Sequence, residues 1–221
     1  IAGLLTAFTA LLLWINSHGW AISLDTATTS WLAARRSLGL DVAATVITDF
    51  GSPVATAALG VSCAALLSWA TRSVIPGVVI IGTVGAAAAA STALKAVVDR
   101  PRPPLQWQVG IETDPSFPSG HVTGTAALLG IIAVVVSVDR TRATRAWLTT
   151  AVVTGVVLVA ATRLYLGVHW LTDVIAGAIL AALFVLIGTT VFDALRRRPG
   201  RSDRQAPPSG HADDSTRVSR S

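Results

Sequence analysis

Six stretches of the chain contain no Asp, Glu, Lys or Arg, and they restrict its fold more than any other feature. They cover residues 1–24, 50–71, 73–94, 115–138, 146–162 and 174–192. A helix crosses a bilayer with about 17–25 mostly apolar residues, because it closes its backbone hydrogen bonds within itself. Charged residues make up 13% of the chain, against about 25% in soluble domains. The pattern predicts an all-α fold, a polytopic membrane bundle of six transmembrane helices.

Two alternatives to this interpretation concern the apolar stretches themselves. A large soluble helical core would need surface helices with polar faces, and the run Val78–Ala90 has no polar face. Residues 1–16 are alternatively a signal peptide, although no cleavage pattern is evident. The membrane bundle remains the favoured interpretation.

The charge-free stretches divide the chain into a membrane domain, residues 1–195, and a tail. Residues 25–49 alternate apolar and charged side chains at spacings that suit a helix lying in the membrane interface, or a plain connecting helix. The tail, residues 196–221, is polar and basic and is predicted to be disordered. We expect the spans near residues 2–17, 52–70, 74–97, 119–138, 146–163 and 170–192.

The arginines predict the orientation of the bundle. Six spans place both termini on one side, and that side collects Arg72, Arg140, Arg142, Arg145 and the arginines of the tail. The positive-inside rule makes this side cytoplasmic, so both termini are expected in the cytoplasm of a plasma-membrane protein. The net charge of +5 thus relates to topology, and no nucleic-acid partner is expected.

Lys95 and Arg102 form the first of three clusters of ionisable residues at predicted helix ends. Lys95 is the only lysine of the chain and lies in the last turns of an otherwise apolar span. An ionisable group at such a depth is a candidate functional residue. The alternative is a lysine that reaches to the interface along its own alkyl stem.

Ser119, Gly120 and His121 form the second cluster, at the start of the fourth span. Ser119 suits the N-cap position, and Gly120 lets an anion approach the backbone. The free N–H groups of a helix start bind anions, and His121 would face such an anion. The alternative is an ordinary cap, and the tetrapeptide alone is a weak signal because Pro208–His211 repeats it within the tail.

Arg163, His169 and Asp173 form the third cluster. His169 and Asp173 are four residues apart and share one face of a helix, so the carboxylate can hold one ring nitrogen protonated and leave the other free. A structural pair is one alternative, and a metal site with His121 as third ligand is another. The cations Lys95, Arg102 and Arg163 would repel a divalent ion and neutralise a phosphate, which favours an anion site without a metal.

The three clusters together resemble the signature of the type 2 phosphatidic acid phosphatase (PAP2) superfamily, K-x6-RP, PSGH and SR-x5-H-x3-D. Every spacing is kept, and Thr162 stands where the family usually has serine. The resemblance implies that His169 attacks phosphorus, that Asp173 orients the ring, and that His121 protonates the leaving oxygen and then activates water. It also implies that Lys95, Arg102, Arg163 and the N–H groups near Ser119 and Gly120 bind the phosphate oxygens, with no cofactor.

The resemblance implies a lipid phosphate in the bilayer as substrate. The short chain and the outward site favour a polyprenyl diphosphate such as undecaprenyl diphosphate. Phosphatidate, phosphatidylglycerol phosphate and prenyl glycolipid phosphates are alternatives, and so is a phosphotransferase with the same residues. An anion transporter or channel is an alternative of another class, but no internal repeat is present. The oligomeric state is not predicted.

Overall fold

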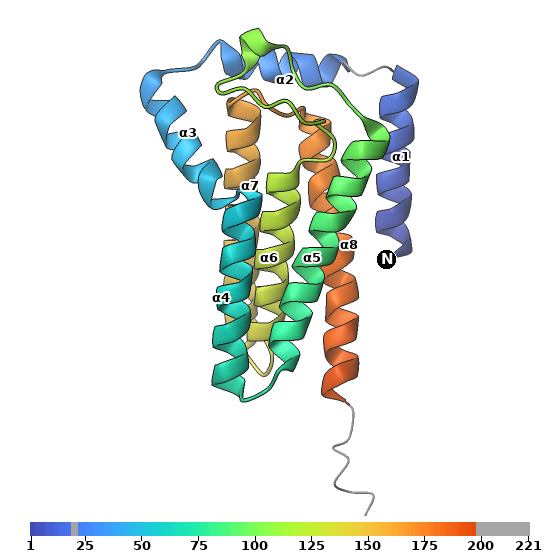
Figure 1. Cartoon of the computed structure of the whole chain (residues 1–221), viewed down its shortest axis with the longest axis vertical. Coiled ribbons are helices and arrows are strands. Elements are labelled where there is room, and N and C mark those ends of the chain that lie inside the picture. Colours follow the sequence, from blue (N-terminus) through green and yellow to red (C-terminus); the bar gives the residue numbers. More distant parts are fainter. Residues whose placement is uncertain (19–21, 198–221) are drawn as a thin grey trace, which may run out of the picture.

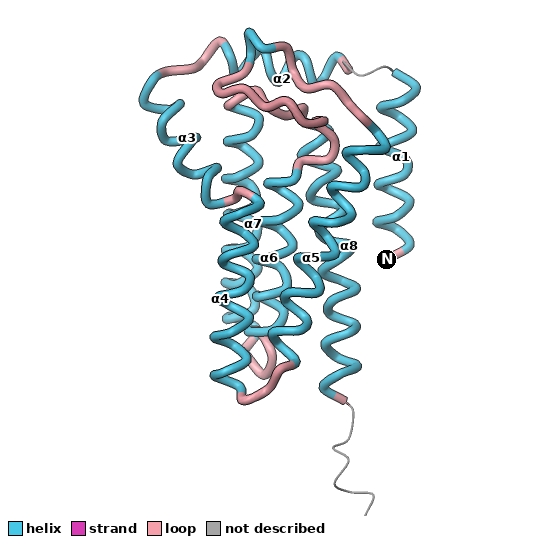
Figure 2. Tube along the Cα trace, viewed as in Figure 1, coloured by secondary structure: helices cyan, strands magenta, loops and turns pink. Residues whose placement is uncertain are grey.

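The computed structural model describes residues 1–18 and 22–197, and this part of the chain consists of helices and loops (Figures 1 and 2). The predicted disordered tail, apart from Arg196 and Arg197, lies outside the described residues, as does the repeated tetrapeptide Pro208–His211. The elements are α1 (Ala2–His18), α2 (Ser23–Ala33), α3 (Leu38–Phe50), α4 (Pro53–Thr71), α5 (Ile75–Val98), the short 3-10 helix η1 (Leu105–Trp107), α6 (Gly120–Val136), α7 (Arg142–Tyr165) and α8 (Leu171–Arg196).

The all-α prediction is confirmed for the described residues, but the count of six full spans is not. Helices α4, α5, α7 and α8 have 19 to 26 residues and are apolar enough to cross a membrane. Helices α1 and α6 are apolar but have 17 residues each. A helix of that length rises about 25 Å, less than the roughly 30 Å of hydrocarbon. The bundle thus combines four helices of spanning length with two shorter ones.

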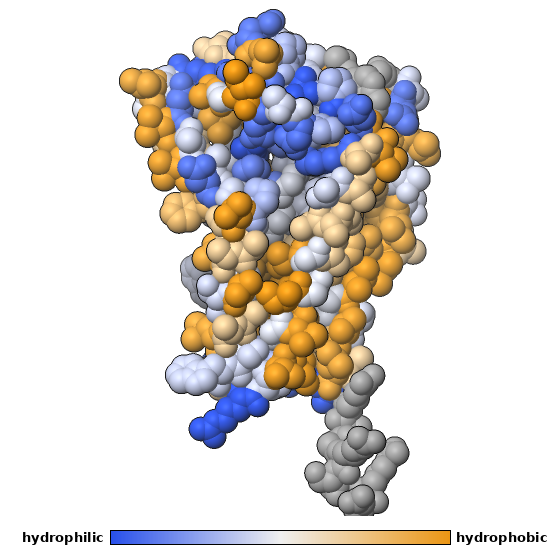
Figure 3. Space-filling model, in the orientation of Figure 1, coloured by the Kyte–Doolittle hydropathy of each residue, from blue (hydrophilic) through white to orange (hydrophobic). Residues whose placement is uncertain are grey.

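Helix α6 lies at the centre of the bundle, against α4, α5, α7 and α8 (Figure 1). Small residues allow the close approach: a Cβ added at Gly130 would lie 2.8 Å from Val185, and one added at Gly188 would lie 2.2 Å from Thr83. The outer faces are apolar, with Trp69 and Val54 each 80% exposed. In Figure 3 hydrophobic residues cover the lower bundle and hydrophilic residues gather at its upper end, as expected for helices that face lipid.

Residues 25–49 form two helices where the sequence suggested one. Helix α2 lies across the upper end of the bundle, and α3 descends from it beside α7 (Figure 1). The chain turns between the two helices, where Arg36 binds residues that are distant in the sequence. Its guanidinium donates to the carbonyl oxygens of Tyr165, at 2.8 Å, and Trp107, at 2.6 Å. These contacts attach the segment to the loops at the upper end.

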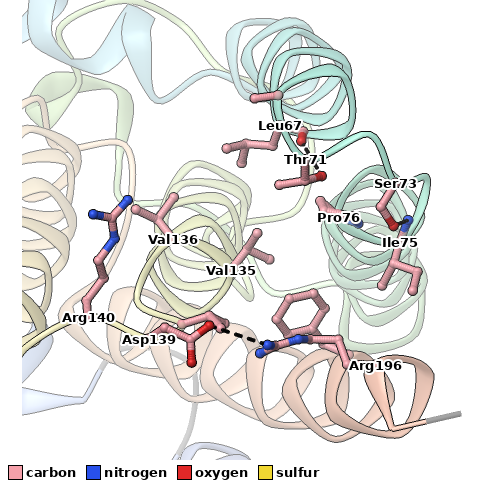
Figure 4. Close-up of a pocket in the computed structure, with 13 residues that line it drawn as sticks. Leu67, Thr71, Ser73, Ile75, Pro76, Val135, Val136, Asp139, Arg140 and Arg196 are labelled. Carbon is pink, nitrogen blue, oxygen red and sulfur yellow. Dashed lines mark hydrogen bonds and ion pairs between the residues drawn. The ribbon is translucent and has the colours of Figure 1, made fainter. Parts of the chain in front are cut away.

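The lower end of the bundle holds a cavity of about 450 Å³, shown in Figure 4. Its charged groups are Arg140 and the ion pair of Arg196 with Asp139, at 3.7 Å. Most of the other lining residues are apolar, among them Leu67, Ile75 and Phe192. The lining contains no histidine or lysine, whereas His121, His169 and Lys95 lie at or next to helix ends at the opposite end of the bundle.

Candidate active site

The upper end of the bundle brings together all eight residues selected from the sequence. Each lies where a helix starts or ends or in a loop beside it, since the loop that follows α5 and the turn that follows α7 meet there (Figure 2). Lys95 is in the last turn of α5, Arg102 in the following loop, Ser119, Gly120 and His121 at the start of α6, Arg163 at the end of α7, His169 in the next turn and Asp173 in the first turn of α8.

The imidazole of His169 lies between a carboxylate and a cation. Its Nδ1 faces Oδ2 of Asp173 at 3.5 Å, and its Nε2 lies 3.3 Å from Nη1 of Arg102. Burial, together with the charges of Arg163 and Arg102, holds the pKa of His169 well below its usual value. The ring is therefore neutral at neutral pH. Its Nδ1 faces Asp173 without a hydrogen bond, and its Nε2, the candidate nucleophile, lies on the side of the cations.

Arg102 is the centre of the cation cluster. Its guanidinium donates to the carbonyl oxygen of Val168 at 2.6 Å, which holds it beside His169. It also binds two acidic residues, Asp114 at 2.7 Å and Glu112 at 2.8 Å. The three contacts make Arg102 the link between the loop that follows α5 and the turn that carries His169.

Glu112 and Asp114 were missed from the sequence, yet they pair with every cation selected there. Glu112 binds Arg163 as well as Arg102, and Asp114 binds Lys95 at 2.9 Å. Burial raises the pKa of each carboxyl, but the cations outweigh it: the pKa of Glu112 is lowered, and that of Asp114 falls to about 2. Glu112 is the only glutamate of the chain, a signal as visible as the lone lysine.

The start of α6 lies against α8 and beside Lys95. The Ser119 N–H donates to the carbonyl oxygen of Asp173 at 3.1 Å, and Gly177 permits this approach, because a Cβ there would lie 2.8 Å from Ser119 O. A Cβ at Gly120 would lie 3.9 Å from Cε of Lys95. His121, one residue later, is half-buried and within electrostatic range of Arg163 and Glu112.

Ser119 occupies the predicted N-cap position of α6, but its side chain does not cap the helix. The hydroxyl is buried and has no hydrogen-bond partner among the described residues. The Nε of Arg163 is buried in the same condition. Buried donors are normally satisfied, so both groups suit a site whose ligand brings acceptor oxygens.

Arg100 and Asp25 form a second buried network that the sequence analysis did not select. Arg100 is 0% exposed and binds Asp25 at 2.8 Å and Asp173 at 2.5 Å. Asp25 also accepts hydrogen bonds from the backbone N–H and the hydroxyl of Thr172, at 3.0 and 2.7 Å. Helix α2 is thereby joined to the first turn of α8, which holds Asp173.

The described residues contain no group of three or more His, Cys, Asp or Glu side chains placed to hold a metal ion. Thr162, which replaces the family's serine, donates its hydroxyl to the carbonyl oxygen of Val159 at 2.7 Å, within its own helix. The Thr162 hydroxyl therefore donates its proton within α7 and not to a group of the candidate site.

An apolar groove of about 600 Å³ reaches the cation cluster from the side of the bundle. It lies between α4, α5 and α6 and is lined by small residues such as Gly60, Gly85 and Ala88. Lys95 and Asp114 lie at one end, next to Gly120. The distance from Ile81 to Lys95 along α5 is about 21 Å, so the groove is long enough for much of a hydrocarbon chain.

Comparisons with known proteins show the family and the fold of this chain. The profile of the PAP2 superfamily matches residues 76–197, more than half of the chain. The crystal structure of the first transmembrane PAP2 type phosphatidylglycerolphosphate phosphatase from Bacillus subtilis superposes with a TM-score of 0.81 at 26% identity, covering 90% of this chain and 98% of that one. Aquifex aeolicus LpxE, at 23% identity, shares the fold with a TM-score of 0.56 over 76% of this chain and 96% of its own. A search of curated proteins gave no match.

Proposed function

Because this chain belongs to the PAP2 superfamily, we propose that it is an integral membrane lipid phosphatase that acts through a phosphohistidine at His169. One observation carries the proposal. The buried imidazole of His169 has the carboxylate of Asp173 at Nδ1 and the guanidinium of Arg102 at Nε2. A neutral nucleophile beside fixed cations is the arrangement that phosphoryl transfer needs.

The reaction proceeds in two steps. In the first, Nε2 of His169 forms a bond to phosphorus and the bond from phosphorus to the leaving oxygen breaks. His121 protonates that oxygen, while Lys95, Arg102, Arg163, the Ser119 hydroxyl and the Gly120 N–H bind the other phosphate oxygens. The Ser119 N–H, which the sequence pattern also suggested, is already bound to the carbonyl oxygen of Asp173. In the second, His121 removes a proton from water, which attacks phosphorus and breaks the bond to His169. Asp173 stabilises the charge on the ring throughout, and no step uses a metal.

The apolar groove supports a lipid as the source of the phosphate. A hydrocarbon chain along α4 and α5 would bring its phosphate to Lys95, where the groove ends. We propose a polyprenyl diphosphate such as undecaprenyl diphosphate as one candidate. Phosphatidylglycerol phosphate is the second, favoured by the likeness to the Bacillus subtilis phosphatase. Phosphatidate and prenyl glycolipid phosphates fit the same groove and cations.

The proposed orientation places the site outside the cytoplasm of a plasma-membrane protein. The end of the bundle opposite the site carries Arg72, Arg140, Arg142, Arg145 and Arg196, at the turns between α4 and α5 and between α6 and α7 and at the end of α8. Such a concentration of arginine marks the cytoplasmic side. Both termini are then cytoplasmic, and the substrate headgroup lies in the outer leaflet.

The test is phosphate release from a panel of lipids by purified protein in detergent. The panel contains undecaprenyl diphosphate, phosphatidylglycerol phosphate, phosphatidate and a prenyl glycolipid phosphate, each compared with the His169→Ala variant. We expect release from at least one lipid, trapping of acid-labile phosphate on His169, and activity that persists in EDTA. Release no greater than that of His169→Ala on every lipid would refute the proposal. Transfer of phosphate to an acceptor other than water would identify a phosphotransferase.

A further inference from the structure

The two carboxylates of the site occupy the cations that the proposed mechanism assigns to phosphate. Asp114 binds Lys95 and Arg102, and Glu112 binds Arg102 and Arg163. We propose that Glu112 and Asp114 form a charge filter, which excludes phosphodiester headgroups and yields only to a terminal phosphate with two negative charges. This inference rests on the proposed function and concerns its substrate class.

The net charge of the cluster explains the selectivity. Three cations and two carboxylates leave a net charge of +1 in the cluster. A terminal phosphate with about two negative charges replaces both carboxylates and leaves this balance unchanged. A phosphodiester has a single negative charge, so the same replacement leaves two positive charges unneutralised. Unpaired charge in a buried site is costly, so the carboxylates hold their positions against a diester.

The two sides of these ion pairs differ in how firmly they are fixed. The side chains of Arg102 and Arg163 are 6% and 3% exposed, and each donates to a further protein group, Val168 O and the Thr48 hydroxyl. The side chains of Glu112 and Asp114 are 29% and 57% exposed and belong to the loop that follows α5 (Figure 2). The side chains of Glu112 and Asp114 can therefore rotate towards the solvent, while Arg102 and Arg163 stay beside His169.

The groove explains why such a filter is useful. Asp114 and Lys95 both line it, so Asp114 lies where a lipid headgroup would meet the first cation. Phosphodiester lipids fill the headgroup layer of a membrane and greatly outnumber any phosphorylated intermediate. Cations without carboxylate partners would bind these diesters and leave the site blocked. Glu112 and Asp114 keep the site available to the scarcer dianion.

The experiment measures binding without turnover. Inorganic phosphate, largely a dianion at about pH 8, and dimethyl phosphate, a monoanion, are titrated into the protein in neutral detergent by calorimetry. We expect phosphate to bind wild-type protein and dimethyl phosphate to bind at least roughly tenfold more weakly, the equivalent of one modest charge interaction. In Glu112→Gln/Asp114→Asn, dimethyl phosphate should bind roughly tenfold more tightly than in wild type. Asp99→Asn changes an exposed residue of the same connection between α5 and α6 and serves as control. Its affinities for both ligands should equal those of wild type.

Two results would overturn the filter: a double variant that still excludes dimethyl phosphate, or wild-type protein that binds the diester as tightly as phosphate. The single variants Glu112→Gln and Asp114→Asn repeat the comparison should the double variant be unstable. Because the readout is binding, the filter is judged even if no lipid of the panel is hydrolysed. In that case the phosphatase proposal fails and a selectivity that is lost in the variant still supports the filter.

Discussion

The fully buried carboxylate of Asp25 lies 2.8 Å from the fully buried guanidinium of Arg100, 75 residues further along the chain. The other end of this guanidinium binds Asp173, at 2.5 Å. Arg100 is therefore shared between a carboxylate on α2 and the carboxylate that faces His169. Asp25 limits how far Arg100 neutralises Asp173, and it holds the first turn of α8 through Thr172.

Removal of the Asp25 carboxylate is expected to lower both stability and turnover. Loss of one partner from a buried ion pair costs about 3–5 kcal/mol, and Asp25→Ala should lie near the lower value because Arg100 keeps Asp173. Asp25→Asn preserves the shape, and we expect it to lower kcat with KM unchanged, since it acts through Asp173. Thermal unfolding and steady-state kinetics measure the two effects, with the exposed Asp99→Asn as control. An Asp25→Asn enzyme with normal kcat would show that the network is structural only.

Features set by local pattern are predictable from the sequence, and features set by tertiary contacts are not. The sequence predicts a start of α6 at Ser119, and the helix begins at Gly120. This start is predictable because the charge-free stretch and its flanking polar residues are contiguous in the sequence. The spacing of His169 and Asp173 likewise belongs to a single helix start. The pairing of Asp25 with Arg100 is tertiary, because it joins residues 75 positions apart in the sequence. No periodicity marks it in the sequence.

Glu112 and Asp114 escaped the sequence analysis for a related reason. They lie in a loop without repeating spacing, and their significance depends on cations contributed by three different segments, at Lys95, Arg102 and Arg163. The break between α2 and α3 is similar, because Arg36 binds carbonyl oxygens of residues that are distant in sequence. The short length of α6 reflects where the chain turns at its two ends, which hydropathy alone does not define.

The two copies of the tetrapeptide PSGH offer a controlled test of context. His121 lies in the first turn of α6 beside the cation cluster, whereas His211 belongs to the second copy, in the tail. His121→Ala should lower kcat by roughly 10²–10⁴-fold, the usual contribution of general acid–base catalysis. His211→Ala should leave kcat and KM unchanged. Equal losses in both variants, or none in either, would contradict the role given to His121.

The lowered pKa of His169 predicts how stability depends on pH. In the unfolded chain the imidazole binds a proton as the pH falls below ~6.5, whereas in the folded protein it stays neutral to a much lower pH. Below about pH 6.5 the unfolded state therefore binds more protons than the folded state. The free energy of unfolding then decreases as the pH is lowered, by up to about 1.4 kcal/mol per pH unit. Thermal unfolding between about pH 5 and 7 measures this, above the range in which Glu112 and Asp114 titrate.

His169→Gln provides the reference for this measurement, because it keeps a polar side chain and removes the titration. The difference in unfolding free energy between wild type and His169→Gln should shrink as the pH falls from about 7 to 5. The other histidines contribute equally to both proteins and cancel. A difference that stays constant over this range would mean that the His169 pKa is close to its ordinary value.

The groove between α4 and α5 predicts a substitution that separates long substrates from short ones. Gly85 lines the groove, and a Cβ added there meets no atom within 4 Å, so Gly85→Leu fills space rather than clashing with the bundle. A hydrocarbon chain would then lose its place, because packed apolar space does not accept extra atoms without strain. We expect kcat/KM for a long-chain lipid phosphate to fall roughly tenfold or more, the equivalent of 1–3 kcal/mol.

Gly82 gives the matched control for this substitution. It lies on the same helix, a Cβ added there also meets no atom within 4 Å, and it does not line the groove. Gly82→Leu changes helix propensity by the same amount, so its kcat/KM should equal that of wild type. Both variants should hydrolyse a short, water-soluble phosphate ester at the wild-type rate, because the cations and His169 are untouched. If Gly85→Leu lowers activity on the short ester as much as on the lipid, the groove does not hold the hydrocarbon chain.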